Sequence, residues 1–157
     1  MGLFGSGSGT LIQQVEEFLK ANDWKFTVMD DNSLIRMGFQ GDNGSWTCLI
    51  RCKEKEGFVL IYSILPNNIP EPNRQAIAEY LTRANYGMRV GNFEMDFEDG
   101  EVRCKTGISI NAAEITQEII KDLLYINLVT TDKYLPGINK VVYGDANPAE
   151  TIQQIES

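Results

Sequence analysis

The hydrophobic and polar positions along the chain follow two periods, which divide it into helical and extended segments. Near the N-terminus, apolar residues recur every three or four positions, the spacing of one helix face. Thr10 precedes this run and Gln13 lies three positions later, so the two side chains can form a capping box. The pattern predicts a helix that begins after Thr10 and ends at Asn22-Asp23. Its apolar stripe consists of Leu11, Ile12, Val15, Phe18 and Leu19.

Between positions 24 and 65, apolar and polar residues alternate, and three clusters of turn-forming residues interrupt the alternation. The predicted strands cover 24–29, 33–40, 45–53 and 58–65. In the third strand, one face carries Trp46, Cys48, Ile50 and Cys52. Because short turns join consecutive strands, these segments predict an antiparallel meander in which that face is buried.

The next predicted helix follows a proline-rich loop at 66–72 and begins near Asn73 or Arg74. Its buried side consists of Ile77, Tyr80, Leu81 and Ala84. Asn85-Tyr86-Gly87 supplies the stop, because a glycine readily adopts the left-handed conformation that ends a helix.

A hairpin is predicted around Asp99-Gly100, a dipeptide favoured in two-residue turns. In this register the opposed pairs are Phe97 with Val102, Asp96 with Arg103, Met95 with Cys104, and Glu94 with Lys105. Apolar side chains then share one face and opposite charges meet on the other, where each ion pair would contribute ~0.2–1 kcal/mol. A slip by one residue would expose the whole apolar set, so the pattern favours this parity.

From Glu114 onward the period is helical again, and apolar side chains cover a wide arc. A helix that is apolar over such an arc is buried on two sides, within its own domain or against a partner. We expect Leu135-Pro136-Gly137 to kink or break it, either to wrap the sheet or to shape a groove. Residues 138–143 can resume the helix, and 149–155 can form a short terminal one. The candidate partner-binding residues are Leu124, Leu128, Tyr134, Leu135 and Ile138.

The order of these elements is α-β-β-β-β-α-β-β-α-α, which predicts an α+β fold with a largely antiparallel sheet and helices packed on it. The chain has 157 residues, a length that suits one domain, and we place that domain at 10–157. Residues 1–9 are rich in Gly and Ser and are expected to form a flexible leader.

Charge and composition exclude several classes of function. The chain carries 22 acidic and 14 basic side chains, a net charge of -8, whereas nucleic-acid binding rests on clustered cations. It has no histidine, which removes Ser-His-Asp and Cys-His catalysis and every imidazole-ligated metal site. Strand pairing and a turn account for the carboxylates at 94–101. We therefore expect no catalytic residue, no metal, no cofactor and no nucleic-acid partner.

The three cysteines are Cys48, Cys52 and Cys104. An odd number without a secretory signal favours reduced, buried thiols in a cytoplasmic protein. The longest dense apolar run, at 58–62, is far shorter than the roughly 20 residues that span a bilayer, so we expect no membrane contact. A thiol-based redox sensor at Cys48 or Cys104 is one alternative.

Several segments, in the same order, resemble the YbjN family, particularly its cyanobacterial members. They are Ile35-Arg36-Met37-Gly38-Phe39, Trp46-Thr47-Cys48, Phe58-Val59-Leu60-Ile61-Tyr62-Ser63, Ile77-Ala78-Glu79-Tyr80-Leu81, Asn85-Tyr86-Gly87, Gly91-Asn92-Phe93-Glu94-Met95-Asp96 and Asp132-Lys133-Tyr134-Leu135-Pro136. The resemblance covers about residues 10–144 and implies a fold similar to type III secretion chaperones, often dimeric. It also implies a role in signalling or regulation without an established enzymatic activity, and it supplies no catalytic residue.

Together these observations predict a non-enzymatic, cytoplasmic regulatory or protein-interaction module, a homodimer that binds a protein or peptide partner. Chaperones of this kind hold extended segments in apolar grooves and by added strands. The alternative is a small-ligand sensor with a pocket between sheet and helices, near Tyr80, Tyr134 and Cys104. Such a sensor requires an apolar cavity of roughly 300 Å3 or more with convergent polar groups.

Overall fold

The computed structural model describes residues 9–111 and 114–157, so the predicted leader lies outside the described residues except for Gly9. The helices are α1 (Leu11–Ala21), α2 (Arg74–Asn85), α3 (Gln117–Tyr143) and α4 (Pro148–Glu156), with a 3-10 turn, η1 (Glu71–Asn73), before α2. The strands are β1 (Thr27–Met29), β2 (Leu34–Gln40), β3 (Ser45–Lys53), β4 (Phe58–Ile64), β5 (Asn92–Met95) and β6 (Val102–Ser109). This is the predicted order of helices and strands, with a shorter first strand.

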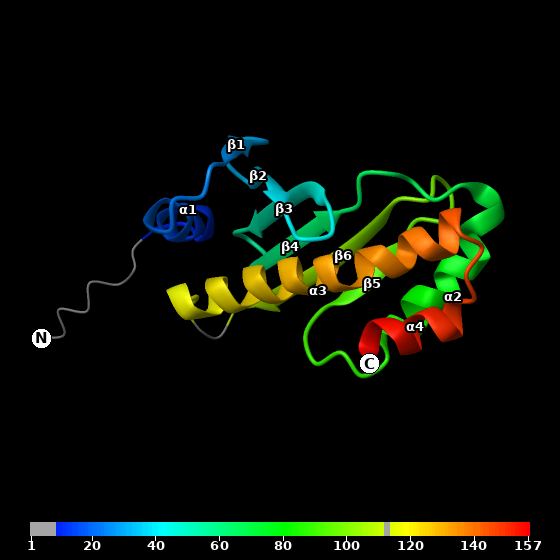
Figure 1. The fold of residues 1–157 in the computed structure, drawn as a ribbon. Helices are drawn as coiled ribbons and strands as arrows, with labels where there is room; N and C mark the ends of the chain where they lie inside the picture. Colours follow the sequence, from blue (N-terminus) through cyan, green and yellow to red (C-terminus); the bar gives the residue numbers. More distant parts are fainter. Residues whose placement is uncertain (1–8, 112–113) are drawn as a thin grey trace, which may run out of the picture.

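One antiparallel sheet of six strands forms the centre of the molecule, in the order β1-β2-β3-β4-β6-β5. Helices pack against one of its faces, and α3 crosses in front of the sheet (Figure 1). On β3 the inward residues are at most 5% exposed, whereas the residues between them are half-buried. The inward residues of β3 are Trp46, Cys48, Ile50 and Cys52. The predicted α+β class, the antiparallel sheet and its buried face are confirmed.

The first helix begins at the predicted capping box. The Thr10 hydroxyl accepts a hydrogen bond from the Gln13 N–H at 3.3 Å, and the Gln13 side-chain oxygen accepts one from the Thr10 N–H at 3.0 Å. Two donors that the first turn would leave unpaired are thereby satisfied. The apolar stripe of α1 then packs into the core, with Val15 and Leu19 fully buried.

The long helix α3 continues through Pro136, so of the predicted kink or break at 135–137 the break is wrong. Proline has no N–H, and it therefore leaves the carbonyl oxygen four residues earlier, that of Asp132, without its helical donor. The Asn43 side-chain nitrogen donates to this oxygen at 3.1 Å. The Asp132 carboxylate in turn accepts from the backbone N–H groups of Asp42, at 3.2 Å, and Asn43, at 2.9 Å. The turn between β2 and β3 thus replaces the hydrogen bond that the proline removes.

Neither α3 nor any other helix within residues 9–111 and 114–157 combines the length and the apolar character that crossing a membrane requires.

Loss of the Asn43 side chain should destabilise the protein chiefly while Pro136 is present. We expect Asn43→Ala to lower the free energy of unfolding by about 1 kcal/mol. In a Pro136→Ala background the loss should be much smaller, because residue 136 then supplies its own N–H to Asp132. Urea unfolding of both single variants and of the double variant measures the difference. An equal loss in both backgrounds would contradict the compensation.

The hairpin of β5 and β6 has the predicted faces, but the predicted register is wrong by two residues. The observed pairs are Asn92–Lys105, Phe93–Cys104, Glu94–Arg103 and Met95–Val102. The Asp96 and Asp99 carboxylates each accept from the N–H two residues later, at 2.8 Å, and stabilise the loop at 96–101 between the two strands. In that loop Gly100 adopts a φ of +81°. Since a shift by two preserves parity, the same face stays buried, while Phe97 becomes 50% exposed.

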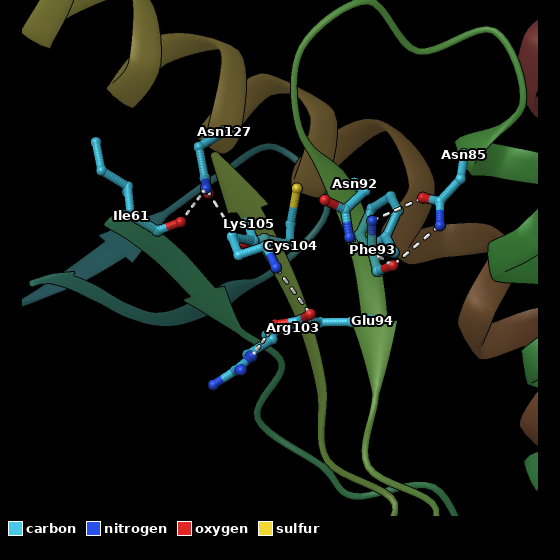
Figure 2. Close-up of polar contacts among 9 residues, drawn as sticks. All are labelled: Ile61, Asn85, Asn92, Phe93, Glu94, Arg103, Cys104, Lys105 and Asn127. Carbon is cyan, nitrogen blue, oxygen red and sulfur yellow. Dashed lines mark hydrogen bonds and ion pairs between the residues drawn. The ribbon is translucent and has the colours of Figure 1, made fainter. Parts of the chain in front are cut away.

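A buried polar side chain on α3, that of Asn127, joins the helix to the centre of the sheet. Its nitrogen donates to the carbonyl oxygens of Ile61 on β4, at 2.9 Å, and Cys104 on β6, at 3.1 Å (Figure 2). Its oxygen accepts from the Ser63 hydroxyl at 2.5 Å, and that hydroxyl accepts from the Trp46 indole N–H at 2.9 Å. Such a fully paired network specifies one position of the helix along the sheet, because any slide would leave polar groups buried without partners.

Truncation of Asn127 should cost far more than truncation of an asparagine on the exposed side of the same helix. We expect Asn127→Ala to lower the free energy of unfolding by about 2–4 kcal/mol, since several buried groups lose their partner. Asn139→Ala is the matched control, because Asn139 is exposed on α3. Urea unfolding followed by circular dichroism measures both. A cost for Asn127→Ala that equals that of the control would contradict the role of the network.

Candidate functional site

The five predicted partner-binding residues all lie on α3 and are at most 6% exposed. They are Leu124, Leu128, Tyr134, Leu135 and Ile138, and they belong to the core cluster. The wide apolar arc is thus buried within its own domain, the first of the two possibilities it allowed. Direct contact of these residues with a partner stays a prediction.

The structure does not bring the five residues to one place on the surface. Leu128 borders a hollow of about 360 Å3 beside the end of β2. Leu135 and Ile138 border a smaller one, of about 130 Å3, next to the loop that follows β4. Tyr134 borders a third, of about 360 Å3, near the C-terminal end of α2. Leu124 has no exposed surface.

Of these hollows, the one at Leu128 adjoins a continuous row of aromatic side chains. Trp24 stacks on Phe39 with ring centroids 6.0 Å apart, and its edge meets Tyr125 at 6.2 Å. Tyr125 and Val129 are four residues apart on α3, hence on one face, and are 38% and 65% exposed. We call Trp24, Phe39, Tyr125 and Val129 the aromatic strip. Phe39 and Val129 also line the hollow.

The aromatic strip lies beside a free strand edge. The edge strand β1 pairs with β2 only at Leu34–Arg36, so positions 37–40 of β2 have no strand neighbour on that side among the described residues. Unpaired N–H and C=O groups on such an edge can accept an added strand. A strand edge without a paired neighbour, next to partly exposed aromatic side chains, can bind an extended peptide, with main-chain hydrogen bonds for affinity and side-chain contacts for selectivity.

Sequence reasoning missed the strip. Trp24 and Phe39 alternate with polar residues, which is equally typical of core positions, and they are in fact half-buried. The available signal was the spacing of Tyr125 and Val129, because two large apolar residues four apart interrupt the polar side of a helix.

The region around Tyr80, Tyr134 and Cys104 is packed with side chains. Tyr80 has no exposed surface, and its hydroxyl donates to the Tyr134 carbonyl oxygen at 2.8 Å. A Cβ added to Gly137 would lie 2.0 Å from that hydroxyl oxygen, so this glycine is where the tyrosine ring enters the helix surface. Cys104 is 1% exposed. The hollow of about 360 Å3 at Tyr134 is lined by neither Tyr80 nor Cys104, so it does not lie between the three residues at which the small-ligand alternative places its pocket.

The cysteines do not form a reactive site. All three thiols are free and buried. Burial raises the pKa of Cys48 and of Cys52 to about 12, and that of Cys104 to about 11. Only the thiolate reacts quickly with oxidants and electrophiles, so protonated, inaccessible thiols speak against the redox-sensor alternative.

The acidic hairpin has one closely paired carboxylate, that of Glu94. It accepts from Lys105 Nζ at 3.1 Å and from Arg103 Nε at 2.5 Å (Figure 2). Partial burial acts to raise the pKa of Glu94, but the hydrogen bonds and charges of Lys105 and Arg103 outweigh it and lower the pKa below the ordinary 4.5. Within residues 9–111 and 114–157, no three carboxylates or thiols gather into a possible metal site.

The contribution of Glu94 to stability should fall in acid. Its pKa is lower in the folded than in the unfolded chain, so the stabilisation is complete above the unfolded value and is lost as the pH falls through the folded value. Glu94→Gln should therefore destabilise the protein more at about pH 7 than at about pH 3. Glu98→Gln, on the exposed hairpin tip, serves as the control. Urea unfolding at both pH values tests this, and a pH-independent cost would contradict it.

Comparison with known proteins identifies a family that matches the sequence and solved structures with a similar fold. The YbjN family, described as "Putative bacterial sensory transduction regulator", matches residues 11–140. The crystal structure of YbjN from E. coli is similar with a TM-score of 0.58 and 9% identity, over 79% of this chain and 90% of that one. The ExsC–ExsE complex contains a chain with a TM-score of 0.52 and 14% identity, over 79% and 90%.

A chain of the HopA1–SchA chaperone–effector complex is also similar, with a TM-score of 0.49 and 16% identity over 74% of this chain and 85% of that one. No curated protein sequence matches the chain. At these identities the structural likeness concerns the fold alone, and the chain in the ExsC–ExsE complex, with its TM-score of 0.52, confirms the expected secretion chaperone-like α+β class. Because the family match extends over most of the sequence and agrees with the fold, the chain belongs to the YbjN family.

Proposed function

We propose that this protein is a non-enzymatic, cytoplasmic regulatory module that binds a segment of a partner protein at the aromatic strip. The observation that carries the proposal is the position of the strip, directly beside the unpaired part of β2. The likeness of the sequence to cyanobacterial members of the family, and the expected homodimer, belong to the same proposal.

The partner segment would bind in an extended conformation. Its main chain would pair with positions 37–40 of β2, and every second side chain would then face the helices. Phe39, Leu128 and Val129 line a hollow of about 360 Å3 there, which is large enough for one or two apolar side chains. Asp42, Asp132 and Lys133 lie around the same hollow and provide a polar rim.

Two further facts favour binding over catalysis. The chain has no histidine, and its three thiols are buried with raised pKa values, so imidazole groups are missing and thiolate groups are inaccessible. The ExsC chain, of similar fold, was crystallised in a complex with another protein, ExsE.

A site-specific crosslink can identify the partner. We expect a benzoylphenylalanine in place of Val129 to capture one protein in the source cell, and the same group in place of Tyr86 not to capture it. Tyr86 is 90% exposed but lies beside a different hollow, near α2 and α4. Both positions are accessible, so the comparison separates specific contact from mere exposure.

Binding of the captured protein, once purified, should then depend on the strip. We expect Val129→Asp to weaken it at least about tenfold, since a charge replaces a central apolar contact. Val90→Asp is the control, because Val90 is 40% exposed outside the strip. Isothermal titration calorimetry compares both variants with the unchanged protein, and equal affinities would contradict the site.

Light scattering of the same samples tests the dimer. We expect twice the chain mass of 17.6 kDa, for Val129→Asp as well as for the unchanged protein. A mass of 17.6 kDa at every concentration would contradict the dimer. A dimer lost only in Val129→Asp would show that the strip contacts a second copy, and would overturn its assignment to another partner.

A further inference from the structure

On the face of the sheet that points away from the helices, the strand residues carry a net charge opposite in sign to that of the whole protein. The strand registers place all charged strand residues on this face, and Glu94 is the one acid among them. The basic residues are Arg36, Arg51, Lys53, Arg103 and Lys105. The face thus holds five of the 14 basic side chains of a chain whose net charge is -8. We call it the open face.

The centre of the open face is apolar. Register places Arg36, Leu49, Tyr62 and Lys105 in one row across four strands, so two apolar side chains lie between two cations. The neighbouring positions on β4 are Phe58, Leu60 and Ile64. Phe58 is 39% exposed, and the others are half-buried although no helix covers them.

The cations are only partly neutralised within the chain. Arg51 pairs with Asp30 at 3.4 Å, an exposed carboxylate, and Glu94 serves both Arg103 and Lys105. In the part of the chain that the structure describes, Arg36 and Lys53 have no ion-pair partner. Arg103 also lies over the Tyr62 ring, with its guanidinium carbon 4.3 Å from the ring centroid, which presents the tyrosine and the cation side by side.

We propose that the open face binds an acidic segment of a partner protein, in which aliphatic or aromatic side chains are interspersed with Asp and Glu. An apolar centre with a charged rim is the usual composition of a protein interface, and Tyr and Arg are the side chains that most often dominate binding energy there. The positive charge favours an acidic segment, and the apolar centre favours aliphatic or aromatic side chains within that segment. This surface is separate from the aromatic strip, and the proposal does not depend on the function assigned to the strip.

Other occupants fit the face less well. Two copies that met through their open faces would bring like charges together, and an open face on the acidic remainder of another copy would make a heterologous contact that need not close. A nucleic acid would meet the net charge of -8, and phosphates gain nothing from leucine and isoleucine at the centre.

The probe for a test is a fluorescein-labelled peptide of twelve residues in which Asp or Glu alternates with Leu or Phe. We expect its fluorescence anisotropy to rise on titration with the full chain, and the affinity to fall as sodium chloride is added. Arg36→Glu should weaken binding by about tenfold, and Arg36→Glu with Lys53→Glu by more. Lys121→Glu changes the net charge by the same amount on α3, across the sheet, and should leave binding unchanged.

Circular dichroism checks that each variant is folded. If Arg36→Glu does not fold, Lys53→Glu alone replaces it as the test variant. Val129→Asp should bind the peptide as the unchanged protein does. The proposal is overturned if the acidic peptide does not bind, if Lys121→Glu weakens binding as much as Arg36→Glu, or if a peptide with Lys in place of the acids binds equally well. Tighter, Arg36-dependent binding of a twelve-nucleotide oligothymidylate would assign the face to single-stranded nucleic acid instead.

Discussion

The arrangement of this protein depends on one buried amide. Asn127 lies on an otherwise apolar stretch of α3, and its hydrogen bonds reach two adjacent strands, β4 and β6, and the Ser63 hydroxyl between the helix and the sheet. Apolar packing alone tolerates small slides of a helix over a sheet, whereas this network is satisfied at one position. The position of α3 also determines the contacts of its other residues. Asp132 meets the turn at Asn43, and Tyr125 meets the ring of Trp24.

The same helix links the core to both ends of the molecule. Near its middle, Tyr125 and Val129 complete the aromatic strip, and one turn further Asp132 holds the turn between β2 and β3. Further on, the absence of a side chain at Gly137 admits the Tyr80 ring from α2. The turn that follows the unpaired part of β2 is thus held to α3 by Asp132, which supports this end of the strand edge.

Much of the fold could be predicted because the alternation of apolar and polar residues decides which of only two strand faces is buried. The inward face of β3, with Cys48 beside Ile50, follows from parity, and so does the buried face of the last hairpin. Its register could not be predicted, since a shift of two residues keeps every apolar side chain inside and only Asx turns at Asp96 and Asp99 decide between the two. The continuation of α3 through Pro136 was hidden because the replacement donor, Asn43, is far away in sequence. The aromatic strip could not be predicted either, because the apolar arc of α3 belongs to the core, while the strip combines two half-buried and two exposed residues from three segments.

When helices cover only one side of a sheet, alternate positions of each strand are under different evolutionary constraints. Along β4, Val59 and Ile61 are constrained by packing in the core. Leu60 and Tyr62 are constrained by any molecule that contacts the outer surface of the sheet. Substitutions at the first kind of position change how much folded protein a cell contains, and those at the second can change its associations while abundance stays constant. Adjacent codons of one strand can therefore evolve at different rates, and a new association can be acquired without rebuilding the domain that carries it.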